Sequence, residues 1–215
     1  RCNTKGWMKR KMPRTISWPW PVKDLKECVE VPKEGFKFST SFVGWDSCNV
    51  RHYVIESCKS MLGNAADIRS YNEFYGYIER DRPKDAEVRR KDFLDSLRLS
   101  KTVLAPRSID SVFPYRFFEA MSAGRVPFLW CNDYVLPFAD VIDWNSCAVF
   151  YDDQDALNAG NLVVEWLRTH SDEDIIKMGR LARGYWEKYL NSVNWADLWT
   201  AAVEKQLAKD GLLNE

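Results

Sequence analysis

The chain has 215 residues with a hydrophobic fraction of 46%, which is enough to bury the core of one large domain, or of one domain with part of a neighbour. Its 31 basic and 31 acidic residues cancel, so no overall charge draws the chain to nucleic acid or to an anionic membrane. Apolar runs stay below the roughly 20 residues that cross a bilayer. Because the chain starts at Arg1, with neither initiator methionine nor signal peptide, we expect a soluble piece of a longer protein.

The first 35 residues show no sustained helical or strand periodicity of apolar residues. They are basic at first and then rich in proline and tryptophan through the run SWPWP. A basic stretch of this kind can contact phosphate or a membrane, but the composition favours a solvated arm. We interpret residues 1–35 as a linker or as the remnant of a preceding domain.

Residues 36–170 alternate strand and helix patterns, the order typical of a parallel sheet with helical crossovers. Glycine ends two of the helices, at Gly63 and Gly124. The expected elements are a strand at 36–44, a helix at 48–62, a weaker strand at 66–71, an irregular aromatic segment, a charged helix at about 85–99, a strand at 101–106, a helix from Ser111 or Pro114 to Gly124, and strands at 126–130 and 147–151.

Three more helices are expected, at about 154–169, 172–190 and 195–209. Ser171 and Asp174 resemble a capping box at the start of the second of these. The fold class is therefore α/β, a Rossmann-like doubly wound parallel sheet with extra C-terminal helices. Residues 171–215 are expected to pack back on the sheet domain or on its neighbour.

Six cysteines are scattered along the chain without the C-x-x-C pairs typical of zinc or redox sites. Most lie in apolar runs, where a free thiol behaves as a small hydrophobic group. We expect unpaired thiols; one or two disulfides are the alternative in an oxidising compartment, which leaves the localisation open. The cysteines are Cys2, Cys28, Cys48, Cys58, Cys131 and Cys147.

Polar residues follow the third expected strand, at the edge where doubly wound sheets bind their ligands. Arg107, Ser108 and Ser111 lie in this turn, and Arg116 and Glu119 lie one helical turn apart in the helix after it. A helix start favours phosphate through its N–H groups and its partial positive charge. We expect Arg107 and Arg116 to neutralise a diphosphate, and Glu119 to accept hydrogen bonds from two ribose hydroxyls.

An ordinary surface ion pair between Arg116 and Glu119 is the alternative, worth roughly 0.2–0.5 kcal/mol at this spacing. The aromatic neighbours Tyr115, Phe117 and Phe118 make free exposure of this helix unfavourable. They therefore favour a nucleotide-sugar site.

The stretch PYRFFEAMSAGRVPFLWCNDYVLPFADVIDWNSCAVF, at 114–150, resembles the C-terminal half of the exostosin family, glycosyltransferase family 47. It has the R-x-x-E-A, A-G-x-V-P and L-P-F-x-x-V-I-D-W motifs in order. Upstream, Arg107 matches the arginine of the family's P-R-G turn. The sequence FVG at 42–44 matches the family's F-x-G segment, and Arg51 follows it by seven residues. The similarity covers about residues 24–170.

The resemblance implies that residues 36–170 form the nucleotide-sugar-binding C-terminal domain of a GT-B enzyme. Such an enzyme is an inverting glycosyltransferase that moves a sugar from a UDP-sugar to the hydroxyl of an oligosaccharide or glycan acceptor. No cofactor is required, and neither a metal nor a nucleic-acid partner is expected. A second GT-B domain or another copy of the chain is the protein partner implied. The family's diphosphate-binding arginine falls on Arg116 and its ribose-binding glutamate on Glu119.

The phosphate-binding turn departs from the family pattern. The glycines usual after the P-R pair are Ser108 and Asp110, and the serine usual two residues before the arginine is Pro114. Asp110 repels a diphosphate unless its side chain turns away.

Other residues carry weaker expectations. Arg51 is either a phosphate ligand or part of a helix-start salt bridge, and Tyr134 either stacks on uracil or sugar or packs into the domain. Asp46 is the one carboxylate that we expect to accept the proton of the acceptor hydroxyl. The alternative is that Asp46 caps a turn and that the base lies outside this chain.

A D-x-D sequence at Asp153 and Asp155 is the metal-binding motif of the other glycosyltransferase fold. It follows a strand and opens a helix, so we expect capping in place of metal binding. His52 and His170 are expected to be surface or helix-end histidines.

Two rival functions stay open. One is a non-catalytic nucleotide-sugar-binding module or subunit. The other is a fucosyltransferase-like GT-B enzyme that uses a GDP-sugar, against which the L-P-F-x-x-V-I-D-W segment argues.

Overall fold

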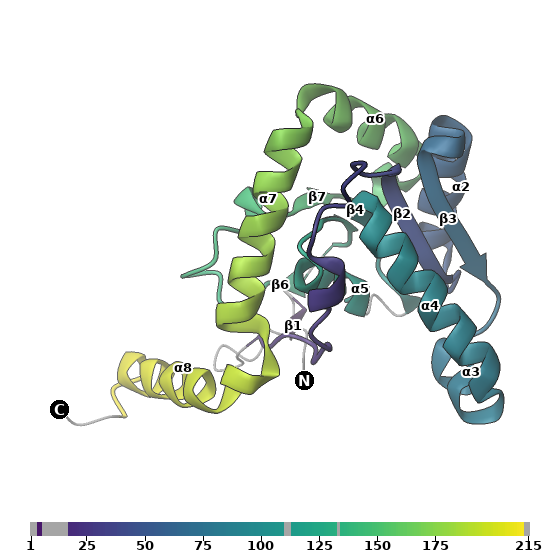
Figure 1. Cartoon of the computed structure of the whole chain (residues 1–215). Helices are drawn as coiled ribbons and strands as arrows, with labels where there is room; N and C mark the ends of the chain where they lie inside the picture. The colour runs from purple at the N-terminus through teal and green to yellow at the C-terminus, as the bar shows by residue number, and fades with distance from the viewer. Residues whose placement is uncertain (1–3, 6–16, 110–112, 133, 213–215) are drawn as a thin grey trace.

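A five-stranded parallel sheet forms the centre of the computed structural model, which describes residues 4–5, 17–109, 113–132 and 134–212 (Figure 1). The strand order is β3-β2-β4-β5-β7. This arrangement confirms the predicted doubly wound α/β fold class. The strands are β2 (Phe38–Trp45), β3 (Ala66–Tyr71), β4 (Ser100–Leu104), β5 (Val126–Trp130) and β7 (Val149–Tyr151), with a separate antiparallel pair of β1 (Thr4–Lys5) and β6 (Tyr134–Val135).

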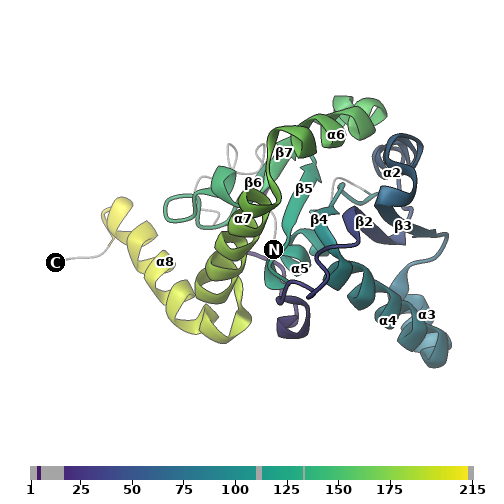
Figure 2. The ribbon, with the colours of Figure 1, turned by 45° about the horizontal axis from the view of Figure 1, so that its top comes forward.

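Helices cover both faces of the sheet (Figures 1 and 2). Helices α2 and α6 pack together on one face, and α4, α5 and α7 lie on the other. Helix α8 extends away from the sheet and buries none of its residues (Figure 1). The helices are α2 (Asn49–Leu62), α3 (Tyr75–Asp81), α4 (Pro83–Leu99), α5 (Tyr115–Ser122), α6 (Ala159–Thr169), α7 (Asp172–Tyr185, continued by a π-helical turn to Leu190) and α8 (Trp195–Lys209).

The core follows from the apolar strands that the sequence marks. Every residue of β5 is buried, as expected for a central parallel strand with helices on both faces. On one face, Phe128 packs with Ile55 of α2 and Val163 of α6; on the other, Phe117 of α5 packs with Trp186. Cys28, Cys48, Cys58 and Cys147 are free thiols, as expected.

Most of the predicted elements are confirmed, including the strand at 66–71 and the capping box of Ser171 and Asp174. The prediction of an irregular aromatic segment before residue 85 is wrong, because residues 75–81 form α3. This helix buries only Ile78, so it has no apolar stripe for a sequence pattern to reveal.

The segment before β2 packs on the domain through its own buried residues. Leu25 and Cys28 are each 1% exposed, and the Leu25 backbone N–H donates to Ser122 Oγ at 2.9 Å. The Arg125 guanidinium, itself 1% exposed, donates to the carbonyl oxygens of Cys28 at 2.5 Å and Leu97 at 3.0 Å. One buried cation therefore joins the N-terminal segment to the end of α4.

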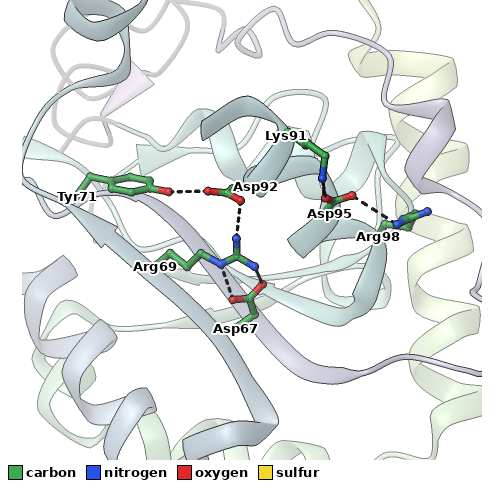
Figure 3. A network of polar contacts seen from close by, with 7 residues as sticks. All are labelled: Asp67, Arg69, Tyr71, Lys91, Asp92, Asp95 and Arg98. Atoms are coloured by element: carbon green, nitrogen blue, oxygen red, sulfur yellow. Dashed lines mark hydrogen bonds and ion pairs between the residues drawn. The ribbon is translucent and has the colours of Figure 1, made fainter. Parts of the chain in front are cut away.

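A polar network ties β3 to α4 on the outer side of the sheet (Figure 3). Arg69 pairs with Asp67 at 2.9 Å and with Asp92 of α4 at 2.8 Å. Tyr71 donates its hydroxyl hydrogen bond to the same Asp92, at 3.5 Å. These contacts fix the position of α4 against β3, which is the edge strand of the sheet.

Among the described residues, no helix is both long and apolar enough to span a membrane.

Replacing Arg125 by methionine should destabilise the fold, because it removes the donors of several buried carbonyl groups. We expect the free energy of unfolding, measured in urea, to fall by about 2–4 kcal/mol. The matched control is Arg98→Met, an arginine whose side chain is 54% exposed; it should change stability by less than about 0.5 kcal/mol. Equal losses in the two variants would contradict this role of Arg125.

Candidate functional site

The loops after β2 and β4 meet at the carboxyl edge of the sheet. Ser47 Oγ lies 3.1 Å from Ser108 Oγ, and the Cys48 thiol donates to the Arg107 carbonyl oxygen at 3.5 Å. Ser108 is thus at the ligand edge, as predicted, and bonds to a serine that the sequence analysis did not single out. The two loops form one surface on which side chains from different strands converge.

Arg116 lies in the first turn of α5 and reaches back to the end of β2. Its guanidinium donates to the Val43 carbonyl oxygen and lies over the ring of Phe42, 4.5 Å from the centroid. Gly44 makes this approach possible, because a Cβ at that position would lie 2.6 Å from Arg116 Nη2. Burial lowers the pKa of Arg116, and the charge of Glu119 opposes that shift.

Arg51 comes from the first turn of α2 and joins the same cluster. Its guanidinium donates to the carbonyl oxygens of Trp45 and Pro106, both at 2.9 Å, so it ties the end of β2 to the chain after β4. Burial, together with the charges of Arg116 and Arg107, lowers the pKa of Arg51 to about 10. Arg51 is therefore close enough to Arg116 and to Arg107 for its charge to be repelled by theirs.

Arg107 is partly neutralised inside the protein. Its Nε donates to Asp153 Oδ2 at 2.5 Å, and both side chains are about four-fifths shielded, at 19% and 20% exposed. The expectation that Asp153 caps a helix start is wrong: Asp152 is the cap, accepting from the Gln154 backbone N–H at 2.8 Å. Asp153 is the second residue after β7, so its carboxylate lies at the carboxyl edge of the sheet beside Arg107.

Glu119 faces α4 and does not point into open solvent. Its carboxylate pairs with Arg90 Nη1 at 3.5 Å, and its side chain is 21% exposed. Arg116 and Glu119 thus each have a partner on another element, unlike a simple surface pair on one helix. The Arg90 contact was not predicted, because residues 29 positions apart show no sequence signal of proximity.

Asp46 and His52 form a hydrogen-bonded pair that their spacing in the sequence does not predict. His52 Nδ1 lies 2.7 Å from Asp46 Oδ2, while the other oxygen of Asp46 is buried without a partner. The imidazole is 54% exposed. Asp46 follows β2 and His52 is in the first turn of α2, so the pair lies at the ligand edge. His170, by contrast, stacks on Trp166 at 4.0 Å between ring centroids, at the end of α6.

The remaining predicted site residues are not placed. Ser111 and Asp110 lie outside the described residues. The backbone of Tyr134 forms part of β6, but its side chain lies outside the described part of the structure.

Unpaired hydrogen-bonding atoms gather at this edge. Among the described residues, the buried atoms without partners include Nε of Arg51, Nε of Arg116 and one carboxylate oxygen of Asp153. Buried polar atoms are normally satisfied, so a concentration of them marks a place that a ligand or water completes. Two unpaired guanidinium N–H donors suit an anion with several oxygens, such as a diphosphate. The described residues contain no group of three or more side chains arranged to hold a metal ion.

Comparison with protein families gives a match over most of this domain. The model of the exostosin GT47 domain matches residues 23–166. Exostosin-1b of Danio rerio is 32% identical over 119 residues, which are 55% of this chain and 15% of that protein. Exostosin-1 of Drosophila melanogaster is 33% identical over 107 residues, 50% of this chain and 13% of that protein. The chain thus spans a small part of these relatives.

Solved structures show a similar fold at low sequence identity. TarM aligns with a TM-score of 0.52 and 15% identity, covering 87% of this chain and 38% of that one. A chain of the GtfA/B complex aligns with a TM-score of 0.50 and 14% identity, covering 88% of this chain and 40% of the other. At these identities the likeness shows the fold alone, which is of the GT-B type.

Substituting Gly44 by alanine should displace the Arg116 guanidinium, because the new methyl group would overlap it. We expect the affinity for inorganic pyrophosphate, measured by calorimetry, to fall at least about tenfold, the loss of one charge-assisted contact. Gly184→Ala is the control, since a Cβ there meets nothing within 4 Å. Unchanged pyrophosphate affinity in a folded Gly44→Ala protein would remove Arg116 from the anion site.

Proposed function

The chain belongs to the exostosin GT47 family, and from this premise we propose that it is the donor-binding part of an inverting glycosyltransferase that takes a UDP-sugar. The single observation that carries the proposal is the convergence of Arg51, Arg107 and Arg116 at the carboxyl edge of a GT-B-type sheet, with unpaired N–H donors. In such sheets this edge is where nucleotides bind.

The diphosphate is the part of the donor that this cluster suits best. Arg116 and Arg51 keep guanidinium donors free after bonding to strand carbonyls, and Arg107 adds a third positive charge that Asp153 balances in part. As the sugar leaves the donor, negative charge builds on the β-phosphate. Fixed cations stabilise that charge more in a partly buried site than in water.

Glu119 supplies the group for the ribose. It lies one helical turn beyond Arg116, and a carboxylate can accept from both hydroxyls of a diol. Its contact with Arg90 holds it beside α4. We assign Arg90 as a positioning residue for Glu119.

The transfer step needs a group that takes the acceptor's proton. The acceptor oxygen attacks the anomeric carbon, the bond from that carbon to the phosphate oxygen breaks, and its electron pair leaves with UDP. We propose that Asp46 takes this proton through its hydrogen-bonded partner His52, because both residues lie at the carboxyl edge of the sheet. The acceptor is a glycan hydroxyl, as the family resemblance implies. A second GT-B domain or a second copy of the chain completes the cleft between donor and acceptor.

Replacing Arg116 by alanine should weaken UDP binding about 10- to 150-fold, which corresponds to one lost charge-assisted contact of roughly 1.5–3 kcal/mol. Calorimetric titration with UDP and with GDP measures this and separates a UDP-sugar enzyme from a GDP-sugar enzyme. Arg80→Ala, an arginine with a side chain 70% exposed on α3, is the control. Wild-type affinity in Arg116→Ala would contradict the assignment.

Replacing Asp46 by asparagine, or His52 by glutamine, should lower the rate of sugar transfer at least about 100-fold and leave UDP affinity within about twofold. Release of UDP in the presence of glycan acceptors measures transfer. His170→Gln at the far end of α6 is the matched control. Full transfer activity in both variants would place the base elsewhere, and tight UDP binding without transfer in the wild type would favour the non-catalytic module.

A further inference from the structure

Three aromatic side chains lie in a row where β2 and β3 end, and we call them the aromatic cradle. Trp45 is the last residue of β2, Phe74 precedes the first turn of α3, and Tyr77 lies within that turn (Figure 1). The ring centroids of Trp45 and Phe74 are 5.8 Å apart, and those of Phe74 and Tyr77 are 5.6 Å apart. Phe74 is 48% exposed and Tyr77 is 60% exposed. Apolar side chains that lie together and stay exposed mark a surface for binding.

The surrounding chain fixes these rings without burying them. A Cβ on Gly76 would lie 2.6 Å from Phe74 Cε1, so the glycine leaves the space that this ring occupies. The guanidinium of Arg80 lies over the ring of Tyr77, 5.6 Å from its centroid. A surface whose side chains are already ordered loses little conformational entropy when a ligand binds.

The cradle begins at the residues that we propose for the acceptor's proton. Asp46 follows Trp45 in the chain, and its backbone N–H donates to the carbonyl oxygen of Tyr71, the last residue of β3, at 2.9 Å. This bond joins the ends of the two strands beside the rings. The carboxylate of Asp46 lies 2.7 Å from His52 Nδ1. An acceptor whose reacting hydroxyl lies at this pair can therefore lay its next sugars across the cradle.

The charged side chains around the rings are paired with one another. Arg82 contacts Glu73, and Arg80 contacts Asp81 at 2.6 Å. Each of these arginines thus has its own carboxylate, so the local charges favour an uncharged ligand over an anionic one. A neutral pyranose fits this surface: its C–H face packs on an aromatic ring, and its hydroxyls bond to the polar groups around the ring.

We propose that the aromatic cradle binds the acceptor, and that this acceptor is a chain of neutral pyranose sugars. The inference rests on the proposed function and adds the chemistry of the acceptor to it. The planes of neighbouring rings are inclined by 59° and 83°. The rings therefore face different directions, which suits a sugar chain that turns from one unit to the next.

The test titrates the chain with hexasaccharides at saturating UDP. The neutral probes are cellohexaose, xylohexaose and mannohexaose, and the acidic probe is hexagalacturonate. Calorimetry should show binding of at least one neutral probe, with hexagalacturonate at least about tenfold weaker. Tyr77→Ala should weaken the bound neutral probe about 5- to 10-fold, the loss of one ring contact, and leave UDP affinity within about twofold. Tyr77→Trp keeps a ring and should stay within about threefold of wild type.

A second ring and a matched control guard against a local loss of structure. Phe74→Ala should weaken the same hexasaccharide about 5- to 10-fold and raise its KM in transfer by the same factor. The control is Trp199→Ala on α8. Trp199 is 51% exposed, close to the value for Phe74, and its ring also contacts another ring, that of Trp18 at 5.3 Å. This variant should change neither hexasaccharide nor UDP affinity.

The outcomes separate the two proposals. A wild-type chain that does not bind UDP overturns the proposed function. If the wild type binds UDP but none of the neutral hexasaccharides, or binds hexagalacturonate equally well, only the acceptor assignment is overturned. Unchanged hexasaccharide affinity in both ring variants would also overturn it. A loss of UDP affinity in those variants would assign the rings to the donor, and a change of oligomeric state alone would assign them to a protein interface.

Discussion

The burial of arginine side chains at the carboxyl edge of the sheet is the interaction on which the site depends. Arg51 and Arg116 lie against the same ring, Phe42, at 5.7 and 4.5 Å, and their charges repel. Carbonyl oxygens at the strand ends take some of their N–H groups, but Nε of each stays unpaired. The fold thus holds positive charge and unused donors in a partly dry place, where an anion gains more than it would in water.

A third buried arginine, Arg125, differs from these two because the backbone satisfies its N–H donors. Arg125 lies where α5 ends and β5 begins, at the opposite edge of the sheet, and its guanidinium donates to carbonyls of the N-terminal segment, α4 and its own turn. That cation is satisfied within the chain and serves stability. Arg116 bonds to one strand carbonyl and keeps its Nε unpaired, and we propose that it is available for binding. The same residue type in the same helix–strand unit therefore has two roles, decided by how many acceptors the backbone places around it.

The alternation of strands and helices could be read from the sequence because buried parallel strands such as β5 are continuous apolar runs, and because Gly63 and Gly124 end helices with positive φ. Helix α3 was missed, since it buries a single side chain and has no periodic apolar face. The contact of Glu119 with Arg90 and the bond of His52 to Asp46 were missed for another reason: each joins residues whose spacing matches no local repeat.

The residue types and their order along the chain determined by themselves that this is a parallel α/β domain with Arg116 and Glu119 on one helix after the third strand of the sheet, because local periodicity and short motifs are properties of neighbouring residues. Only the tertiary structure decided that Arg51 joins Arg116 over Phe42, that Asp153 balances Arg107 where a helix cap was expected, and that Glu119 turns toward α4. Those outcomes depend on how distant strand ends and helices pack, and packing brings together charges that the linear sequence keeps apart.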